Sequence, residues 1–284
     1  MKVGIQLYSL RNHMAENPIG AIQTVVKEGY RYLEAANHNA AQDSGVGFGI
    51  SAGDLKKVLE DAGAHLVSAH IAPLDDQTLG PVLEYYREAG AKYLVVPAYF
   101  YDNREDALKS AETLNKIGKA CSRAGILLLY HNHFQEFQIF SGETVFETLM
   151  KNTDPALVGF ELDTYWAMRG GNDPAALLRR CGKRVRLIHQ KDYPAAYKDK
   201  INLIDTVNEK GIRLDMTYMM GIVDKNTFTE IGTGIMNIQD IITAGNEVCQ
   251  ADYIILEQDF SSRDELESIR ISMDNFKKFN GIQW

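Results

Sequence analysis

The sequence has little of what several classes of protein require. Its 284 residues include only 3 cysteines and 7 prolines. The cysteines are far apart, at positions 121, 181 and 249, and form no CxxC pair, which excludes a disulfide scaffold and is typical of reduced thiols. No apolar run approaches the ~18 residues of a membrane-spanning helix. We therefore expect a cytoplasmic protein without membrane contact, with a signal peptide removed by processing as the alternative.

An excess of basic residues is also missing. Lysine and arginine number 30 against 38 acidic residues, for a formal net charge of −8. Nucleic acids and anionic membranes select basic surfaces, so neither is an expected partner. Hydrophobic residues make up 45% and charged residues 24%, which is ordinary for a folded protein and excludes general disorder.

Short apolar runs recur along the chain, and most are followed by an amphipathic stretch. Continuous apolar character indicates strands that are buried on both faces of a parallel sheet. The runs are residues 3–7, 32–35, 65–69, 93–96, 126–130, 158–162, 185–188 and 253–256. The amphipathic stretches are residues 18–28, 51–61, 78–88, 104–123, 143–151, 173–180, 237–248 and 262–279.

Eight strand–helix repeats with short connections predict a single α/β domain, a (β/α)8 barrel over residues 1–284. A doubly wound open sheet is the weaker alternative, because no GxGxxG follows any predicted strand. Residues 193–234 interrupt the rhythm after the seventh strand, and we expect an inserted loop with short helices over the mouth of the barrel.

Polar side chains end most of the predicted strands. In such barrels the active site lies where the strands end, so these residues should share one rim. They are Tyr8, Glu34, His70, His131, Asn132, His133, Glu136, Asp163, Trp166, His189, Lys191, Glu257 and Asp259.

Carboxylates together with an imidazole on one rim indicate a divalent-metal site, for Mn²⁺, Mg²⁺, Co²⁺, Fe²⁺ or Zn²⁺. We predict Asp163, His189 and Glu257 as ligands, with Glu136 as the fourth. Alone, Asp163 could cap the next turn and His189 could be a hydrogen-bonded core histidine. The position of Glu257 favours the metal-site interpretation, because a carboxylate that ends a buried strand needs a partner.

These motifs resemble the xylose-isomerase-like barrels, which include sugar phosphate isomerases and epimerases, inosose dehydratases and 3-keto-glycoside-processing enzymes. The resemblance covers essentially the whole chain. It is carried by residues 4–11 (GIQLYSLR), 68–70 (SAH), 130–137 (YHNHFQEF), 161–166 (ELDTYW), 188–192 (IHQKD), 231–234 (IGTG) and 256–259 (LEQD).

The resemblance implies one divalent cation held by two glutamates, an aspartate and a histidine. Asp163, His189 and Glu257 match three of these ligands. Many members have a glutamate near the position of His131, so this sequence departs from the pattern there. Glu136 is the predicted substitute, with His131 and His133 as alternatives.

The resemblance also implies the chemistry. A cation polarises a sugar carbonyl, and a side chain removes the proton from the neighbouring carbon. Isomerisation or epimerisation of a sugar or keto-sugar is the main expectation. A lyase or dehydratase acting on a keto-inositol or 3-keto-glycoside is the alternative, because the HNHxxEF string resembles the branch of the family that acts on such substrates. A catalytically idle sugar-binding or partner subunit is the alternative of another class, and an apurinic-site endonuclease of the same fold is disfavoured by the acidic charge.

Further roles are assigned as hypotheses. Glu136, Glu257, His133 and Lys191 are the predicted acid–base or charge-stabilising groups. The predicted contacts to substrate are Tyr8, Glu34, His70, Asn132 and Trp166. No phosphate cradle is evident, which favours a non-phosphorylated carbohydrate, and a homo-oligomer is a family expectation.

Overall fold

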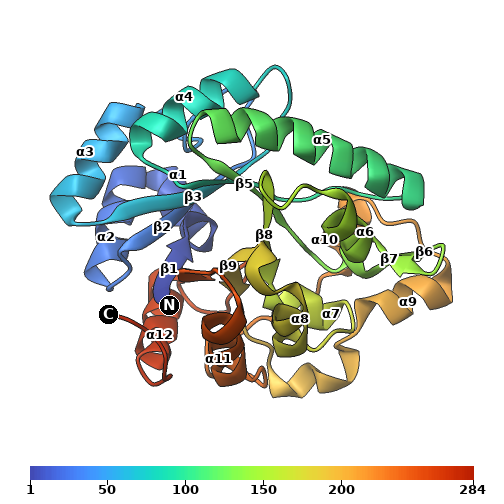
Figure 1. Ribbon diagram of the computed structural model, residues 1–284. Helices are drawn as coiled ribbons and strands as arrows, with labels where there is room; N and C mark the ends of the chain where they lie inside the picture. Colours follow the sequence, from blue (N-terminus) through green and yellow to red (C-terminus); the bar gives the residue numbers. More distant parts are fainter.

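Eight parallel strands close into a barrel at the centre of the molecule (Figure 1). The structure is a computed structural model that describes residues 1–284 apart from the side chain of Met220. Around the barrel the strand order is β1-β10-β9-β8-β5-β4-β3-β2, which confirms the predicted (β/α)8 architecture. The strands are β1 (Lys2–Gln6), β2 (Tyr32–Asn37), β3 (His65–Ile71), β4 (Tyr93–Val96), β5 (Leu127–His131), β8 (Val158–Asp163), β9 (Val185–Gln190) and β10 (Tyr253–Leu256).

Helices cover the outside of the barrel (Figure 1). Most begin at a side chain that accepts a hydrogen bond from the first turn, as Ser51 does from the amide of Asp54. The helices are α1 (Arg11–Glu16), α2 (Pro18–Lys27), α3 (Ala52–Ala62), α4 (Leu79–Ala89), α5 (Arg104–Arg123), α6 (Val145–Asn152), α7 (Thr164–Arg169), α8 (Pro174–Cys181), α9 (Leu203–Lys210), α10 (Met216–Ile222), α11 (Ile238–Val248) and α12 (Glu265–Phe276). Among the described residues, none of them combines the length and the apolar composition that crossing a bilayer requires.

The barrel interior is apolar at the end where the strands begin and polar where they end. A compact apolar cluster fills the first part, formed by Val67, Tyr93, Val95, Leu129, Leu187, Tyr253 and Ile255. Inward-facing residues alternate along a strand, so the next inward positions after Leu129 in β5 and Leu187 in β9 are His131 and His189. The apolar plug therefore forms a floor under the polar rim that the sequence predicts.

Apart from 3-10 helices, three short features were not predicted. The six-residue helix α1 precedes α2, a hairpin of β6 (Ile139–Phe140) and β7 (Glu143–Thr144) precedes α6, and α7 begins directly after β8. All three are shorter than the window over which hydrophobic periodicity can be recognised.

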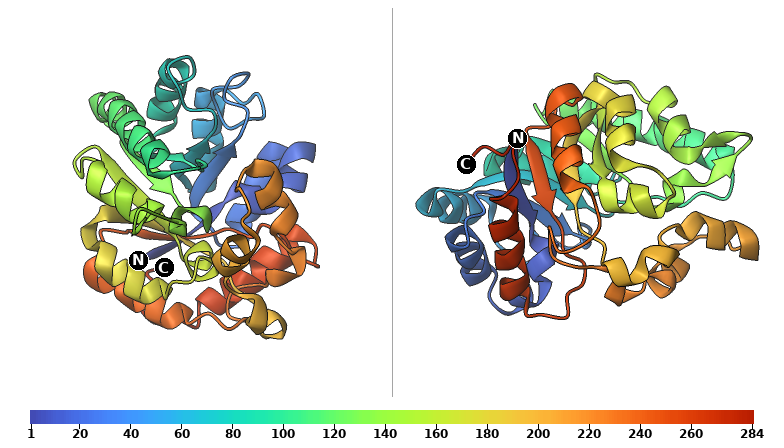
Figure 2. Two further views of the ribbon diagram at one scale, coloured as in Figure 1. Left: turned by 90° about the vertical axis from the view of Figure 1, so that its right-hand side faces the viewer. Right: turned by 90° about the horizontal axis from the view of Figure 1, so that it is seen from below.

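Residues 193–234 contain α9, α10 and short 3-10 helices, including η4 (Ala195–Lys200) and η5 (Lys225–Thr227). Figures 1 and 2 show these helices at the side of the molecule away from the two chain termini. Phe228 stacks on Tyr165 of α7, with the ring centroids 4.8 Å apart, and Tyr165 Oη lies 3.0 Å from the carbonyl of Thr227. The segment thus packs on the helix that follows β8, and its status as an insertion stays a prediction.

The carboxylate of Asp192, just after β9, holds the end of the segment 193–234 by hydrogen bonds. Its Oδ1 accepts hydrogen bonds from the amides of Tyr193 and Met236, and its Oδ2 accepts them from Gly232 and Gly234. A Cβ at Gly234 would lie 2.3 Å from Asp192 Oδ1 and 2.4 Å from the carbonyl of Tyr193, so only glycine fits there. The return of the chain to the barrel is fixed by one buried carboxylate.

The closure of the barrel at β1 gives a stability prediction. A Cβ at Gly4 would lie 2.7 Å from the carbonyl oxygen of Tyr32 in β2 and 2.5 Å from Ile255 Cδ1 in β10. Gly4→Ala should therefore lower the free energy of unfolding by about 1–3 kcal/mol, as overpacking does, measured by urea denaturation. Gly80→Ala is the matched control, because Gly80 lies in α4 with nothing near its Cβ position. A Gly4→Ala protein as stable as wild type would contradict the close approach.

Candidate active site

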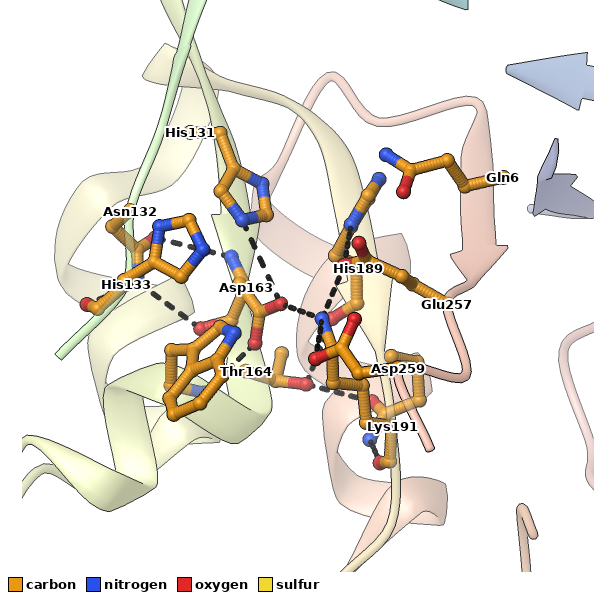
Figure 3. Close-up of polar contacts among 12 residues, drawn as sticks. Gln6, His131, Asn132, His133, Asp163, Thr164, His189, Lys191, Glu257 and Asp259 are labelled. Atoms are coloured by element: carbon orange, nitrogen blue, oxygen red, sulfur yellow. Dashed lines mark hydrogen bonds and ion pairs between the residues drawn. The ribbon is translucent and has the colours of Figure 1, made fainter. Parts of the chain in front are cut away.

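Four polar side chains converge where the barrel strands end. His131 ends β5, Asp163 ends β8, His189 lies near the end of β9, and Glu257 follows β10. Strand pairing sets Asp163 opposite His189, and His189 opposite Ile255, two residues before Glu257. Figure 3 shows His131 and Asp163 approaching His189 and Glu257.

We name His131, Asp163, His189 and Glu257 the upper group. One nitrogen or oxygen atom from each lies within 4.8 Å of the others, and all four residues are buried. His189 Nδ1 is 3.0 Å from Glu257 Oε2, and His131 Nε2 is 3.8 Å from Asp163 Oδ2. Two imidazoles and two carboxylates at this spacing could hold a metal ion.

Lys191 supplies positive charge to the upper group. Its ammonium lies 2.5 Å from Asp163 Oδ2, also contacts Glu257 Oε2, and is 3.9 Å from Asp259 Oδ2. Burial disfavours the charged form, but Asp163, Asp259 and Glu257 outweigh it and raise the pKa of Lys191 well above its ordinary value. The ammonium therefore partly compensates the buried carboxylates.

A second set of groups lies one layer deeper, and we name Glu34, His70 and Glu161 the lower group. Glu161 precedes Asp163 by two residues in β8 and so faces the same interior. Its Oε2 lies 2.5 Å from His70 Nε2 and 3.0 Å from His131 Nδ1. His131 and His189 therefore link the two groups. Each contacts an upper-group carboxylate through one ring nitrogen and a lower-group carboxylate through the other.

Glu34, predicted to contact substrate, has both oxygens engaged by the protein. Oε1 lies 2.7 Å from Gln6 Nε2 and 2.7 Å from His189 Nε2, and Oε2 accepts a hydrogen bond of 2.6 Å from Ser68. His70 lies between the two lower carboxylates. Their roles toward a substrate stay predictions, and the structure places both beneath the upper group.

Glu136 does not come into either group. It lies in the 3-10 helix η2 (Gln135–Phe137), where Oε1 accepts a hydrogen bond of 2.6 Å from Tyr130 Oη. Oε2 accepts one of 2.8 Å from the amide of His133. His131, which the sequence left as an alternative, stands in the upper group where Glu136 was expected. The metal and catalytic roles of Glu136 stay predictions.

Of the other predicted residues, Asn132, His133 and Trp166 adjoin the upper group. Asn132 pairs with the backbone of Asp163, through Oδ1 to its amide at 3.0 Å and Nδ2 to its carbonyl at 3.2 Å. His133 packs on Trp166 with the ring centroids 5.5 Å apart, and burial lowers the pKa of His133 to about 3. Tyr8 borders a hollow of about 180 Å³. Imidazole, indole and phenol rings thus lie around the rim.

Glu161 is the main group that the sequence reasoning missed. It stands inside an apolar run, and only the residues that end the strands were considered. The signal was the alternation in Glu161-Leu162-Asp163, which places both carboxylates on one face of a strand.

Comparison with known proteins agrees with the motifs. The model of a family described as "Xylose isomerase-like TIM barrel" matches residues 22–279. An inosose dehydratase from Clostridium beijerinckii is 27% identical over 190 residues, which are 61% of this chain and 59% of that protein. An inosose dehydratase from Mesomycoplasma hyopneumoniae is 29% identical over 187 residues, 65% of this chain and 57% of that protein. The chain thus matches somewhat more than half the length of these two dehydratases.

Solved structures show the same fold. A sugar phosphate isomerase/epimerase from Parabacteroides distasonis is 26% identical with a TM-score of 0.77, and the alignment covers 99% of this chain and 95% of that one. The IolI protein, whose structure contains a zinc atom, has a TM-score of 0.68 at 15% identity, covering 98% of this chain and 97% of that one. At that identity the second likeness concerns the fold alone.

The burial of Glu136 gives a pH prediction. Burial raises its pKa from 4.5 to about 7, against the hydrogen bonds from Tyr130 and the His133 amide. Because the folded state holds this proton more tightly, its contribution to stability is full below pH 4.5 and is lost as the pH rises to about 7. Relative to Glu136→Gln, wild type should lose about 3 kcal/mol of unfolding free energy over that range.

Urea denaturation of both proteins at a series of pH values measures this difference. Glu60→Gln, on the exposed face of α3, controls for the pH dependence of the rest of the molecule. A difference between wild type and Glu136→Gln that stays constant with pH would show that Glu136 has the same pKa in the folded and unfolded states.

Proposed function

The chain belongs to the xylose isomerase-like TIM barrel family, and on that premise we propose that it is a metal-dependent lyase that dehydrates a keto-inositol or a related keto-sugar. The observation that carries the proposal is the upper group, in which two imidazoles and two carboxylates converge in a buried site beside the Lys191 ammonium. The similarity to inosose dehydratases favours dehydration among the reactions that such a site supports.

The upper group suits one divalent cation. His131, Asp163, His189 and Glu257 would hold it, and this mixed nitrogen and oxygen set is compatible with Mn²⁺, Fe²⁺, Co²⁺ or Zn²⁺. Buried carboxylates need a compensating charge, and one ammonium shared by Asp163 and Glu257 compensates only part of theirs. The zinc in the IolI structure supports a metal in a barrel of this kind. The cation would polarise the ketone oxygen and so acidify the neighbouring C–H bond.

The chain's own groups would manage the protons. Dehydration removes a proton from the carbon beside the ketone and expels the hydroxyl on the next carbon as water, leaving a carbon–carbon double bond. Glu257 and the neutral imidazole of His133 are the proposed proton acceptors, because carboxylates and imidazoles perform this task when placed beside the substrate. Lys191 is the proposed support for negative charge on the ketone oxygen.

Trp166 and Tyr8 would face the ring of the substrate. Trp166 packs between His133 and Phe228, so its orientation is fixed by neighbours on both sides. A rigid aromatic surface beside the polar group suits a carbohydrate, which has apolar C–H faces and polar edges.

Isomerisation or epimerisation is the second candidate. It is favoured by the sugar phosphate isomerase/epimerase from Parabacteroides distasonis, which matches nearly the whole chain. The two reactions share proton removal and differ in the next step, since a lyase releases water and an isomerase or epimerase returns the proton to carbon.

Metal content is the first test. Purified wild type, measured by mass spectrometry after reconstitution, should hold close to one equivalent of a divalent metal. Asp163→Asn should reduce the occupancy at least about 10-fold, because it removes a charged ligand. Asp240→Asn, in a surface pair with Arg179, is the matched control and should keep the metal. Wild type without metal, or an Asp163→Asn protein with full occupancy, would refute the proposed site.

Turnover separates the reactions. A keto-inositol, a 3-keto-glycoside and a ketose should be incubated with the loaded protein in D₂O and followed by NMR. A lyase should give a dehydrated product, with a rate at least about 100-fold lower in Glu257→Gln, as expected when a charged group at the reacting atoms is lost. Deuterium incorporation without loss of water would replace the lyase by an isomerase or epimerase. A metal-loaded protein that exchanges no deuterium would indicate a binding role.

A further inference from the structure

His131 presents a different ring nitrogen to each layer of the site. Nδ1 lies 3.0 Å from Glu161 Oε2 in the lower group, and Nε2 lies 3.8 Å from Asp163 Oδ2 in the upper group. We infer that Glu161 is a positioning residue that fixes the hydrogen of His131 on Nδ1, and so leaves Nε2 as the atom that binds the metal. The inference rests on the proposed metal site and names a residue that acts on it from below.

The hydrogen-bonding chemistry leads to this assignment. A neutral imidazole carries its hydrogen on one nitrogen and a lone pair on the other, whereas an ionised carboxylate can only accept. His131 and Glu161 are both buried. The carboxylate beneath the ring therefore selects the form whose lone pair points into the upper group.

The backbone holds the two residues in this relation. Strand pairing between β5 and β8 sets His131 directly opposite Glu161. His70 approaches the same oxygen of Glu161 through Nε2, at 2.5 Å, and its ring stacks on His189 with the centroids 5.1 Å apart and the planes inclined by 9°. Glu161 is thus fixed from two sides, and its position does not depend on a flexible loop.

His189 shows the same arrangement with the other lower carboxylate. Nε2 lies 2.7 Å from Glu34 Oε1, while Nδ1 lies 3.0 Å from Glu257 Oε2 in the upper group. The imidazoles of His131 and His189, which we call the shared imidazoles, therefore each contact one carboxylate of the lower group and one carboxylate of the upper group. Histidines that bind metals commonly donate their second ring N–H to a carboxylate in this way, which orients the ring and raises its basicity.

A second cation in the lower group is the competing interpretation, because His70, His131, Glu161 and His189 also place ligand atoms within 4.8 Å of one another. The contacts favour the positioning role. Three of the four lower carboxylate oxygens already lie at hydrogen-bond distance from Gln6, Ser68 and three imidazoles. The fourth, Glu161 Oε1, makes no hydrogen bond and lies 3.2 Å from His189 Nε2. A cation there would have to displace these donors.

Zn²⁺ affinity, measured by competition with a chromophoric chelator on the full chain, tests the inference. Glu161→Gln should weaken binding roughly 10–100-fold, and the absorption bands of the Co²⁺-loaded variant should shift. Ser68→Ala is the matched control, because it removes a buried hydrogen bond to Glu34 without touching a ligand of the upper group. It should leave the Zn²⁺ affinity within about 3-fold of wild type, since it leaves both shared imidazoles their carboxylates.

A double-mutant cycle shows whether Glu161 acts through His131. In a His131→Ala background, Glu161→Gln should weaken Zn²⁺ binding by no more than about 3-fold, because the imidazole that it orients is gone. The other ligand beside Glu161 is His189, which keeps its shorter contact to Glu34, 2.7 Å against 3.2 Å to Glu161 Oε1. An undiminished effect in that background would overturn the inference, as would a Glu161→Gln protein with wild-type affinity. Wild type that binds no Zn²⁺ would refute the proposed metal site instead, so the two failures are distinguishable.

The tautomer itself can be observed without any variant. Two-bond proton–nitrogen correlation spectra of metal-free wild type, with ¹⁵N-labelled histidine, should show His131 hydrogenated at Nδ1. Hydrogen on Nε2 of His131 would contradict the inference even if every variant failed to fold.

Discussion

Burial of charge inside the barrel is the constraint on which the rest of the site depends. Glu34, Glu161 and Asp163 are fully buried, and Glu257 is nearly so. Isolated carboxylates in such surroundings would be strongly destabilising, so each must find a donor or a cation. The structure supplies Lys191 to the upper pair, and imidazoles, Gln6 and Ser68 to the lower pair. The apolar plug lies beneath them, and in such low-dielectric surroundings each of these interactions is stronger than it would be in water.

The parts of the fold that depend on periodicity were predictable. Buried strands read as apolar runs and their covering helices as amphipathic stretches, so the barrel and most element positions can be derived from the residues alone. The polar rim was predictable as well, because Asp163 and Glu257 stand where apolar runs stop. The six-residue helix α7 was not predicted, because it is too short for its periodicity to be recognised. The double task of Asp163 was not predicted either. Its Oδ1 caps that helix by accepting from the amide of Trp166, while its Oδ2 faces Lys191, and a sequence does not reveal that one carboxylate performs both.

The side chain that the fifth strand contributes to the upper group could not be predicted from the sequence. Glu136 is close to His131 in the chain, and spacing alone left Glu136, His131 and His133 as alternatives. In the structure the Tyr130 hydroxyl and the His133 amide hold the carboxylate of Glu136, whereas the imidazole of His131 lies within 4.8 Å of the other three residues of the upper group. Spacing along the chain does not show which of these side chains the turn after β5 directs toward the group. Glu161 was missed for a different reason, because it lies inside an apolar run rather than at the end of a strand. Its contact with His131, which lies opposite it in the neighbouring strand, appears only in the structure.

The net charge of the upper group determines whether the site can stabilise negative charge on a ketone oxygen. Burial disfavours the charged form of His189, but Glu161 and Glu34 outweigh it and raise the pKa of His189 well above its ordinary value. Without a metal, His189 and Lys191 therefore face the two carboxylates of the upper group, and no surplus of positive charge is left for an enolate. A divalent cation held there would supply that positive charge and stabilise negative charge on a ketone oxygen. Neutral imidazoles serve such a site better than two further carboxylates would, because they bind without adding negative charge. In the proposed metal site, the lower carboxylates would make those imidazoles effective ligands while keeping their own charge one layer away from the substrate.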